Sequence, residues 1–436
     1  MAHSLEKLVQ PLGGFINRVS SLPTYPGEPD FPIQVASTGD ISQSLSHLSS
    51  LNPGKSLTGD MDGAGGSLHE KDSRIKAIAE ALERYSSCVY SEEQFIWATA
   101  AELGSKALDL KKVPICSETE LSHPRCPVNK PLLDSPLRWV KGMSLHTQEE
   151  TWIPAIMTYL HLPAMSQGER FWLPISTGCA AHTSYEQALV NAICEVIERD
   201  AISLTWYQEL PLPHIIFDKK PDQEMTEFLN KTFENGNIKQ YLFDGTTDLG
   251  IPTIYSLQLT PDNKKLAALI MCATDLNPQK AINKVMREAA SSRIAMMAER
   301  PAPQDIDDFY NVFHGATYMG KAERLHAYDF LVRSPNQSNL SELPNLEREN
   351  AGENLKFLLN RLEEKGLEAF AVDLTTDEAI HADMRVVRVI IPGLQPLSFS
   401  YRCRFLGHPR LYEATKAMGY PVKAESEINA WPQPFA

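Results

Sequence analysis

The stretch that decides the fold is AICEVIER, residues Ala192–Arg199, which the chain repeats in modified form as AIAEALER at Ala77–Arg84. Both copies follow the pattern A-x-x-E-x-x-E-R, with apolar or small residues at the x positions. Residues three and four apart share one face of an α-helix, so each copy predicts a helix that presents Glu, Glu and Arg together. Two such helices could supply four carboxylates to one site, which suits divalent cations and, through them, a polyphosphate.

A solvated helix face with Glu–Arg pairs is the competing interpretation, and most charged clusters on helices are of that kind. The residues around the repeat argue against it, because they are mainly apolar, and charges on a mostly buried helix are costly unless they bind something. The second copy is the cleaner one, since Arg74 and Lys76 flank the first. The two copies match each other while the sequence around them does not, which favours one chemical requirement met twice.

Composition excludes several classes of function. The 436 residues carry a formal net charge of −14, which argues against a nucleic-acid surface and against binding to an anionic membrane. The longest apolar run, Leu266–Ala273, is too short to span a bilayer, and Met1–Gln10 has no signal-peptide core. Seven scattered cysteines without a C-x-x-C pair disfavour a structural zinc site or a disulfide framework. We therefore expect a cytoplasmic protein.

Alternating helical and strand patterns predict an α+β (mixed α/β) fold. Residues 1–60 are expected to form an irregular N-terminal segment, and residues 61–436 a folded domain that ends in a proline-rich tail. Apolar periodicity predicts long helices over 71–89, 185–206 and 278–299, with Ser184 as the cap of the second. Strands are expected at 138–145, 151–160, 214–218, 239–243, 252–258, 265–273, 369–374 and 386–391.

Two glycine-containing segments are candidate phosphate sites, and the pattern of the first is the more convincing. Gly63–Gly66 precedes the first predicted helix, and a glycine-rich entry to a helix can hold phosphate; a flexible turn is an equally good interpretation. Gly54–Ser56 matches only the last three letters of a Walker A loop, so we interpret it as a chance match.

Taken together, these motifs resemble the YcaO family. That resemblance implies the YcaO-type fold, in which long helices pack on mixed β-sheets, and an ATP site without a P-loop. It covers roughly residues 60–436 and rests on the two E-x-x-E-R repeats, on Ser176–Ala181 (STGCAA), on Glu186–Ala188, on Lys284, Glu288 and Arg293 of the third helix, and on Val386–Leu394 followed by Gly407 and Arg410.

Site residues follow from the resemblance position by position. The carboxylates implied to hold Mg²⁺ are Glu80, Glu83, Glu195 and Glu198. The implied nucleotide or phosphate contacts are Arg84, Gln187, Arg199, Lys284, Glu288 and Arg293. This assignment is chemically coherent, because Mg²⁺ held by carboxylates neutralises a triphosphate and cationic side chains stabilise the charge of a phosphoryl group in transfer. Lys76 stands where the family often has Ser, and it either pairs with a phosphate or points to solvent. Ser291 stands where many members have Gln.

The family implication for activity is ATP-dependent phosphorylation of a peptide amide oxygen. In the azoline-forming branch, a Cys, Ser or Thr side chain of a ribosomal precursor peptide closes a thiazoline or oxazoline. That branch often ends in a P-x-P-x-P tail near the active site. Here Pro432, Pro434 and Ala436 occupy the three positions, with alanine replacing the last proline. Thioamide or amidine formation on a peptide, and a non-catalytic nucleotide-binding regulator, are the alternatives.

Partners also follow from the resemblance. We expect a ThiF-like protein that binds the leader of the precursor peptide, because no leader-binding segment is evident in the chain. The resemblance also implies an FMN dehydrogenase as a further candidate member of the same complex. A homo-oligomer or a hetero-complex is therefore expected. Of the other reactive residues near the second repeat, Cys179 is best interpreted as a buried small residue, and His182 is more often structural than a general base.

Overall fold

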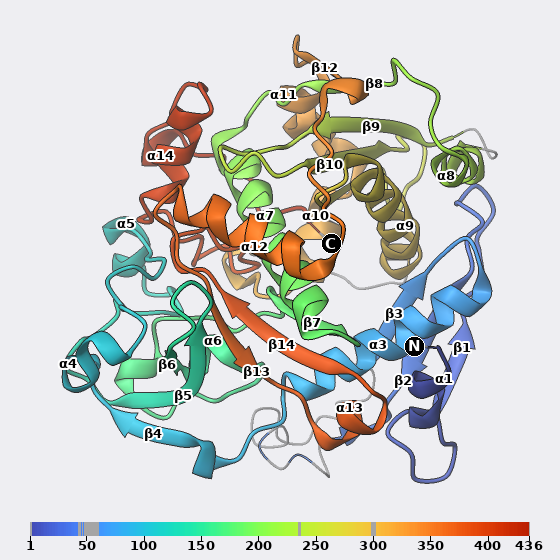
Figure 1. Cartoon of the computed structure of the whole chain (residues 1–436). Helices are drawn as coiled ribbons and strands as arrows, with labels where there is room; N and C mark the ends of the chain where they lie inside the picture. Colours follow the sequence, from blue (N-terminus) through green and yellow to red (C-terminus); the bar gives the residue numbers. More distant parts are fainter. Residues whose placement is uncertain are drawn as a thin grey trace.

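The computed structural model describes residues 2–41, 45, 47, 61–233, 237–297 and 302–435. Three β-sheets surround a central helix, α7 (Tyr185–Gln208), and the predicted α+β class is confirmed (Figure 1). The Walker-like residues Gly54–Ser56 lie outside the described part of the chain. No helix within the described part is long and apolar enough to cross a membrane.

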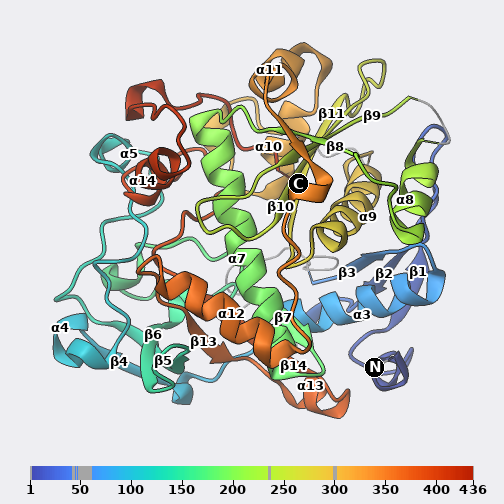
Figure 2. The same ribbon diagram turned by 45° about the horizontal axis from the view of Figure 1, so that its top comes forward.

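The central helix α7 carries the second repeat and is buried along most of its length. Ser184 caps its N-terminus as predicted, since the Ser184 hydroxyl accepts a hydrogen bond from the backbone N–H of Gln187 at 3.3 Å. The helix ends at Glu209, whose left-handed backbone (φ 48°) terminates the helical geometry. Helix α12 (Ala351–Glu363) packs across α7 (Figure 2).

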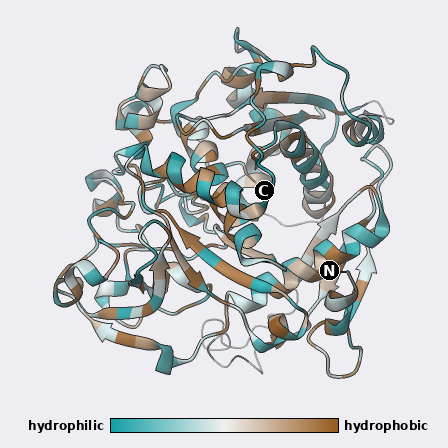
Figure 3. Cartoon of the chain, in the orientation of Figure 1, coloured by the Kyte–Doolittle hydropathy of each residue, from teal (hydrophilic) through white to brown (hydrophobic). Residues whose placement is uncertain are grey.

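One antiparallel sheet of six strands lies beside α7. Its path runs β4 (Phe95–Ala98), β5 (Leu137–Ser144), β13 (Phe370–Asp373), β14 (Arg385–Ile390) and β7 (Cys179–His182), with β6 (Glu150–Pro154) paired to β5. Strand β14 packs against α7 and is drawn mostly in the hydrophobic colour in Figure 3. The strand predicted for 151–160 is too long: it ends at Pro154, where the chain turns into the short helix α6 (Ala155–Thr158).

A second sheet carries the third long helix, α9 (Pro278–Met297), on one face. Its order is β11 (Ala268–Thr274), β10 (Thr253–Leu259), β9 (Lys239–Asp244), β8 (His214–Ile216) and β12 (Gln337–Asn339), and only the β8–β12 pair is parallel among these described strands. Helix α8 (Gln223–Phe233) packs on α9. The four strands predicted between 214 and 273 are confirmed, with ends shifted by a few residues.

The third sheet corrects the prediction for the N-terminal part. Strands β1 (Arg18–Ser21) and β2 (Ile33–Ser37) pair with β3 (Gly63–Gly66), and the sheet packs against α3 (Glu70–Ser86), which carries the first repeat. The described residues before 60 are therefore integrated into the domain rather than irregular. Short β-branched stretches between prolines and glycines hide these strands from a periodicity argument.

Gly63–Gly66 is neither a phosphate loop nor a flexible turn, but a strand pressed onto a helix. A Cβ atom on Gly65 would lie 2.1 Å from the Ser73 carbonyl oxygen, and one on Gly63 would lie 2.1 Å from that of Ala77. The glycines are required because β3 and α3 approach closely at the first repeat.

Shorter helices complete the described structure. They are α1 (Ala2–Leu5), α4 (Ala100–Leu103), α5 (Glu118–Ser122), α10 (Val312–Met319), α11 (Asp329–Val332), α13 (Asp377–His381) and α14 (Arg410–Ala417). Two large hydrophobic clusters flank the repeats: one joins α7, α9 and the five-stranded sheet, and the other joins α3 and the six-stranded sheet.

Candidate active site

Three helices bring their charged residues together at the centre of the molecule. The pKa of Glu83 on α3 is influenced by Glu195 on α7, and the pKa of Lys284 on α9 by Glu195 and Glu198 on α7. We call the residues of this group the carboxylate cluster: Glu80, Glu83, Arg84, Glu195, Glu198, Arg199, Lys284 and Glu288. The two copies of the sequence repeat thus face one common region, as predicted.

Four backbone N–H groups, from three segments of the chain, hold the glutamates. Glu80 accepts from Ala64 at 2.9 Å, Glu195 from Gly178 at 3.1 Å and Glu198 from Thr274 at 3.0 Å. The Glu83 carboxylate accepts from the backbone of Ala181. Each carboxylate is therefore oriented by a strand or turn outside its own helix, which limits the rotamers available to it. These four donors could not be assigned from sequence, because a backbone donor can belong to any residue type.

The negative charges of the cluster oppose one another. Burial, together with the neighbouring carboxylates of Glu195 and Glu80, raises the pKa of Glu83 well above its ordinary value. Burial also raises the pKa of Glu288, and the negative charge of Glu198 raises this pKa further. Carboxylates whose ionisation is disfavoured by each other are stabilised by an added cation, so the electrostatics of the cluster favour binding a metal ion or a positively charged group.

Glu198 is the most buried glutamate of the cluster, with a side chain only 2% exposed. Its Oε2 atom lies 2.9 Å from Lys284 Nζ, and its Oε1 atom lies 3.7 Å from Arg199 Nη2. Although burial opposes it, the coulombic effect of Glu198 and Glu288 raises the pKa of Lys284, so the ammonium stays charged. This pair joins α7 to α9 inside the cluster.

The two arginines of the repeats pair with glutamates one turn earlier. Arg84 Nη2 lies 2.7 Å from Glu80 Oε1, and Arg199 Nη2 lies 3.2 Å from Glu195 Oε1. Within the described residues, no three His, Cys, Asp or Glu side chains come close enough together to hold a metal ion as they stand. The oxygen donors and their mutual repulsion do fit Mg²⁺, provided that the two guanidinium groups release the carboxylate oxygens they occupy.

The side chains of two predicted contacts, Arg293 and Gln187, are bonded to residues outside the cluster. Arg293 is fully buried, and its guanidinium is bonded to Glu28, Gln258 and Thr260, with Nη2 2.9 Å from Glu28 Oε1. These are the contacts of a residue that holds the N-terminal segment to α9. The Gln187 side chain donates to Asn191 at 2.8 Å on the same helix. A direct phosphate contact by either residue has no support in these bonds.

Lys76 and Ser291 lie where the helices α3 and α9 meet the strand β3. The Lys76 ammonium lies 3.5 Å from Ser67 Oγ, and burial, with a contribution from the charge of Arg287, lowers its pKa to about 8. Lys76 is therefore half-buried and not directed to bulk solvent. Ser291 packs against Gly66 of β3: a Cβ atom on Gly66 would lie 2.4 Å from Ser291 Oγ. A longer side chain at position 291 would therefore collide with β3.

The proline-rich tail is ordered and reaches the cluster. Pro432, Pro434 and Phe435 are buried, while Ala436 lies outside the described residues. Phe435 pairs with Ile270 of β11, and its ring centroid lies 4.6 Å from the guanidinium carbon of Arg199. Gln433 approaches Gly315 so closely that a Cβ atom there would lie 1.9 Å from the Gln433 carbonyl oxygen. The aromatic residue Phe435, which sequence reasoning passed over, is the part of the tail that contacts a repeat.

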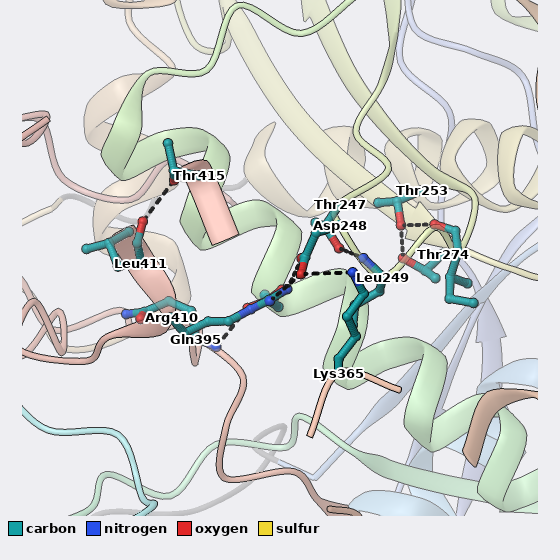
Figure 4. Close-up of polar contacts among 12 residues, drawn as sticks. Thr247, Asp248, Leu249, Thr253, Thr274, Lys365, Gln395, Arg410, Leu411 and Thr415 are labelled. Atoms are coloured by element: carbon teal, nitrogen blue, oxygen red, sulfur yellow. Dashed lines mark hydrogen bonds and ion pairs between the residues drawn. The ribbon is translucent and has the colours of Figure 1, made fainter. Parts of the chain in front are cut away.

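A buried ion network fixes α7 immediately after the second repeat. Arg410 Nη2 lies 2.7 Å from Asp200 Oδ2, and the Gln395 backbone N–H donates to Asp200 at 2.8 Å. The same Nη2 atom lies 2.7 Å from Asp248 Oδ1, and Arg410, Asp248 and Gln395 are labelled in Figure 4. Asp200 is fully buried. The network joins α7 to α14 and to the segment after β14, and it holds the turn of α7 that follows Arg199.

The remaining reactive residues beside α7 have structural contacts. Cys179 is buried, and its Sγ atom lies 3.2 Å from both Ser87 Oγ and Arg388 Nη1, while burial raises its pKa. His182 accepts the backbone N–H of Ser184 at 3.1 Å, and burial lowers its pKa. Both arrangements agree with the structural interpretation of these residues.

Comparison with known proteins defines the family. The family model described as "YcaO cyclodehydratase, ATP-ad Mg2+-binding" matches residues 64–395, so the chain belongs to the YcaO family. An uncharacterised protein of Methanothermobacter thermautotrophicus is 27% identical over 338 residues, which cover 77% of this chain and 82% of the relative. The family-model match includes both repeats and the third helix, and it supports the assignment of this chain as an enzyme of the cyclodehydratase type.

Solved structures share the fold. A heterocyclase in complex with substrate and cofactor has a TM-score of 0.81 at 22% identity; the similarity covers the whole of this chain but only 57% of that chain. The YcaO of Methanopyrus kandleri, bound with AMPPCP and Mg²⁺, has a TM-score of 0.61 at 17% identity, with 90% of this chain and 88% of that chain covered. In the Escherichia coli microcin synthetase McbBCD complex with bound pro-MccB17, one chain has a TM-score of 0.62 at 16% identity, with 98% and 99% covered.

Proposed function

We propose that this protein is an ATP-dependent cyclodehydratase that phosphorylates an amide oxygen of a ribosomal precursor peptide. A Cys, Ser or Thr side chain of the peptide attacks the preceding amide carbon, ATP phosphorylates the resulting oxygen, and phosphate leaves as the thiazoline or oxazoline forms. The arrangement that carries the proposal is the carboxylate cluster, in which glutamates from α3 and α7 converge and each is oriented by a backbone N–H.

The cluster fits this chemistry by charge and by donor type. Glu80, Glu83, Glu195 and Glu198 would hold Mg²⁺, which when bound neutralises the triphosphate and polarises the phosphoryl group in transfer. Lys284 and the two repeat arginines supply cationic N–H donors at the same place, and such donors stabilise developing negative charge. The buried network at Asp200 holds the turn of α7 that follows the arginine of the second repeat.

The C-terminal tail supports the azoline-forming branch. Phe435 places an aromatic face against Arg199, so the tail borders the cluster. We expect Pro432 and Pro434 to hold the tail in the extended form that lets it reach this position, since proline fixes φ near −65°. The heterocyclase and McbBCD similarities are consistent with this branch.

Partner proteins belong to the same proposal. The McbBCD similarity concerns a chain that works in a complex with a bound precursor. We infer a precursor peptide and a ThiF-like leader-binding protein as partners for this chain, with an FMN dehydrogenase as a further component of the complex. Co-purification of the tagged chain with the products of neighbouring genes tests this inference, and recovery of the chain alone under mild conditions would contradict it.

Titration of Mg·ATP into the purified protein tests the site. Glu80→Gln and Glu198→Gln should each weaken binding by at least about tenfold, because each removes a charge from the cluster. Glu363→Gln, an exposed residue of α12, is the matched control and should bind Mg·ATP like the wild type. Unchanged affinity in both cluster variants would refute the site.

Mass spectrometry of a modified Cys-, Ser- or Thr-rich peptide tests the reaction. Azoline formation removes one water per modified residue. A gain in mass from sulfur would instead indicate a thioamide. Loss of water with fragmentation that places the new bond on the main-chain nitrogen would indicate an amidine. Mg·ATP binding without any change in the peptide, in the presence of the partners, would favour a nucleotide-binding regulator.

A further inference from the structure

A pocket opens beside the second repeat, on the part of α7 that carries Val196 and Arg199. It lies between α7, β14 and the segment before β7, and its empty space, together with the open solvent at its mouth, is about 460 Å³. Its walls are mainly apolar, with Trp172, Val196 and Leu394 among them. Arg199 belongs both to this wall and to the carboxylate cluster, so the pocket and the cluster share one residue.

Two guanidinium groups in the wall have N–H donors that find no hydrogen-bond partner in the described part of the chain. Arg388 is 3% exposed; its Nη1 donates to the Ile175 carbonyl at 2.8 Å, but its buried Nε has no hydrogen-bond partner among the described residues. The Nε and Nη1 atoms of Arg199 are also buried, and neither has a hydrogen-bond partner among the residues that the structure describes. Buried donors of this kind cost free energy unless a ligand or water completes them.

The wall also holds an unpartnered acceptor. The Gln395 side chain is 1% exposed, and its Nε2 donates to the carbonyls of Arg404 and Phe405, each at 3.2 Å. Because both neighbours are acceptors, the amide cannot be turned around, and its buried Oε1 is left without a partner among the described residues. The pocket lining therefore carries both unpartnered donors and an unpartnered acceptor among the described residues.

We propose that this pocket receives an amide of the substrate peptide together with an adjacent apolar side chain. The proposal rests on the proposed function for the peptide nature of the substrate. A peptide amide offers a carbonyl oxygen to the guanidinium N–H groups of Arg388 and Arg199, and an N–H to Gln395 Oε1. The apolar side chain then occupies the walls near Trp172 and Leu394.

A small anion fits the pocket less well. Phosphate would satisfy the guanidinium donors, but its charge would face apolar walls and it would gain nothing from them. An amide with an apolar side chain uses both parts of the lining. The pocket would then select an apolar residue close to the amide that reacts at the cluster, since Arg199 joins the two places.

Ligand-observed NMR on the full chain without ATP tests the proposal. The probes are N-acetyl-leucine methylamide, N-acetyl-aspartate methylamide and inorganic phosphate. The leucine probe should bind at least about tenfold more tightly than the aspartate probe, and phosphate should not displace it. Equal binding of the two amides, or displacement of the leucine probe by phosphate, would overturn the assignment.

Variants place the binding in this pocket. Arg388→Met removes the Nε donor, and Ile175→Trp fills the half-buried rim without removing a charge. Each should weaken the leucine probe by about tenfold. Arg385→Met, on the same strand but outside the lining, is the matched control and should bind as wild type. Unchanged binding in a folded Ile175→Trp protein would overturn the proposal even if Arg388→Met did not fold.

The two proposals fail separately. The probe experiment needs neither nucleotide nor metal, so loss of the pocket assignment leaves Mg·ATP binding by the cluster untouched. Conversely, if the chain binds the leucine probe but not Mg·ATP, the proposed reaction fails while the pocket assignment stands.

Discussion

Glu198 on α7 and Lys284 on α9 form an ion pair, with 2.9 Å between Oε2 and Nζ, in which the Glu198 side chain is only 2% exposed. The same Oε2 atom accepts the backbone N–H of Thr274 at 3.0 Å. Helix α7, helix α9 and strand β11 therefore meet at one carboxylate. This carboxylate has both a structural role and a place in the cluster.

Removing Lys284 should expose the structural role. Lys284→Met leaves a buried carboxylate without its nearest cation, so we expect a loss of about 3 kcal/mol in the free energy of unfolding. Glu198→Gln combined with Lys284→Met should recover most of this loss without restoring Mg·ATP binding. Urea unfolding of the two single variants and the double variant measures the coupling; additive losses would show that the pair is not coupled.

The repulsion at Glu83 should make stability depend on pH. Its folded-state pKa is raised above the ordinary 4.5, so its contribution to stability is complete below that pH and is lost as the pH rises through the window above it. Glu83→Gln lacks this loss. The free energy of unfolding of the variant should therefore exceed that of the ligand-free wild type by a margin that grows with pH, by about 1.4 kcal/mol per unit within the window. Thermal melts between mildly acidic and neutral pH check this, and a constant margin would contradict it.

Phe435 should affect activity more than stability. Phe435→Leu keeps an apolar side chain beside β11 but removes the aromatic face from Arg199, an interaction worth about 1 kcal/mol. We expect a small change in melting temperature and a clear loss of peptide-stimulated ATP hydrolysis. Deletion of residues 432–436 should abolish peptide modification. Full turnover by the deletion variant would remove the tail from the mechanism.

Gly65 should tolerate no side chain. A Cβ atom on Gly65 would lie 2.1 Å from the Ser73 carbonyl oxygen and 2.5 Å from the Ala77 nitrogen, so Gly65→Ala must push β3 off α3. We expect a loss of about 2 kcal/mol in the free energy of unfolding. Gly352→Ala is the matched control, because that glycine lies in α12 with its nearest neighbour at 3.4 Å, and it should be neutral or slightly stabilising. Equal effects of the two substitutions would contradict the close-approach argument.

The ion network behind the second repeat should also be testable. Asp200→Asn weakens the bond to Arg410 and leaves its guanidinium partly unpaired in the interior, which should cost about 3 kcal/mol. If Asp200 positions Arg199, the folded variant should also bind Mg·ATP more weakly than the wild type. Normal affinity in a destabilised variant would restrict Asp200 to a structural role.

Sequence patterns predicted the long helices well because their apolar periodicity is strong. The bounds of α7 and α9 and the cap at Ser184 agree with the prediction to within a few residues. The convergence of the two repeats could also be predicted, since identical spacing indicated a shared chemical requirement. The assignment of Glu80, Glu83, Glu195 and Glu198 to Mg²⁺ stays a prediction.

Other features depend on contacts between distant parts of the chain and leave no local pattern. The pairing of β1 and β2 with β3 required the tertiary fold, as did the backbone donors to the glutamates. Arg293 matched a family position, yet its pairing with Glu28 depends on the N-terminal segment. The unpartnered Nε donor of Arg388 could not be predicted, because it depends on the packing of β14 beside α7. The sequence shows only an arginine in an apolar strand.

The Glu28–Arg293 pair has a consequence for biosynthesis. Its two residues are 265 positions apart, and both side chains are buried. During translation the segment that carries Glu28 leaves the ribosome long before Arg293 is synthesised. The Glu28 carboxylate and the apolar strands around it therefore stay exposed to solvent for most of the synthesis of the chain. The N-terminal sheet can reach its final environment only after α9 has emerged, so we expect this part of the domain to complete its folding late in synthesis.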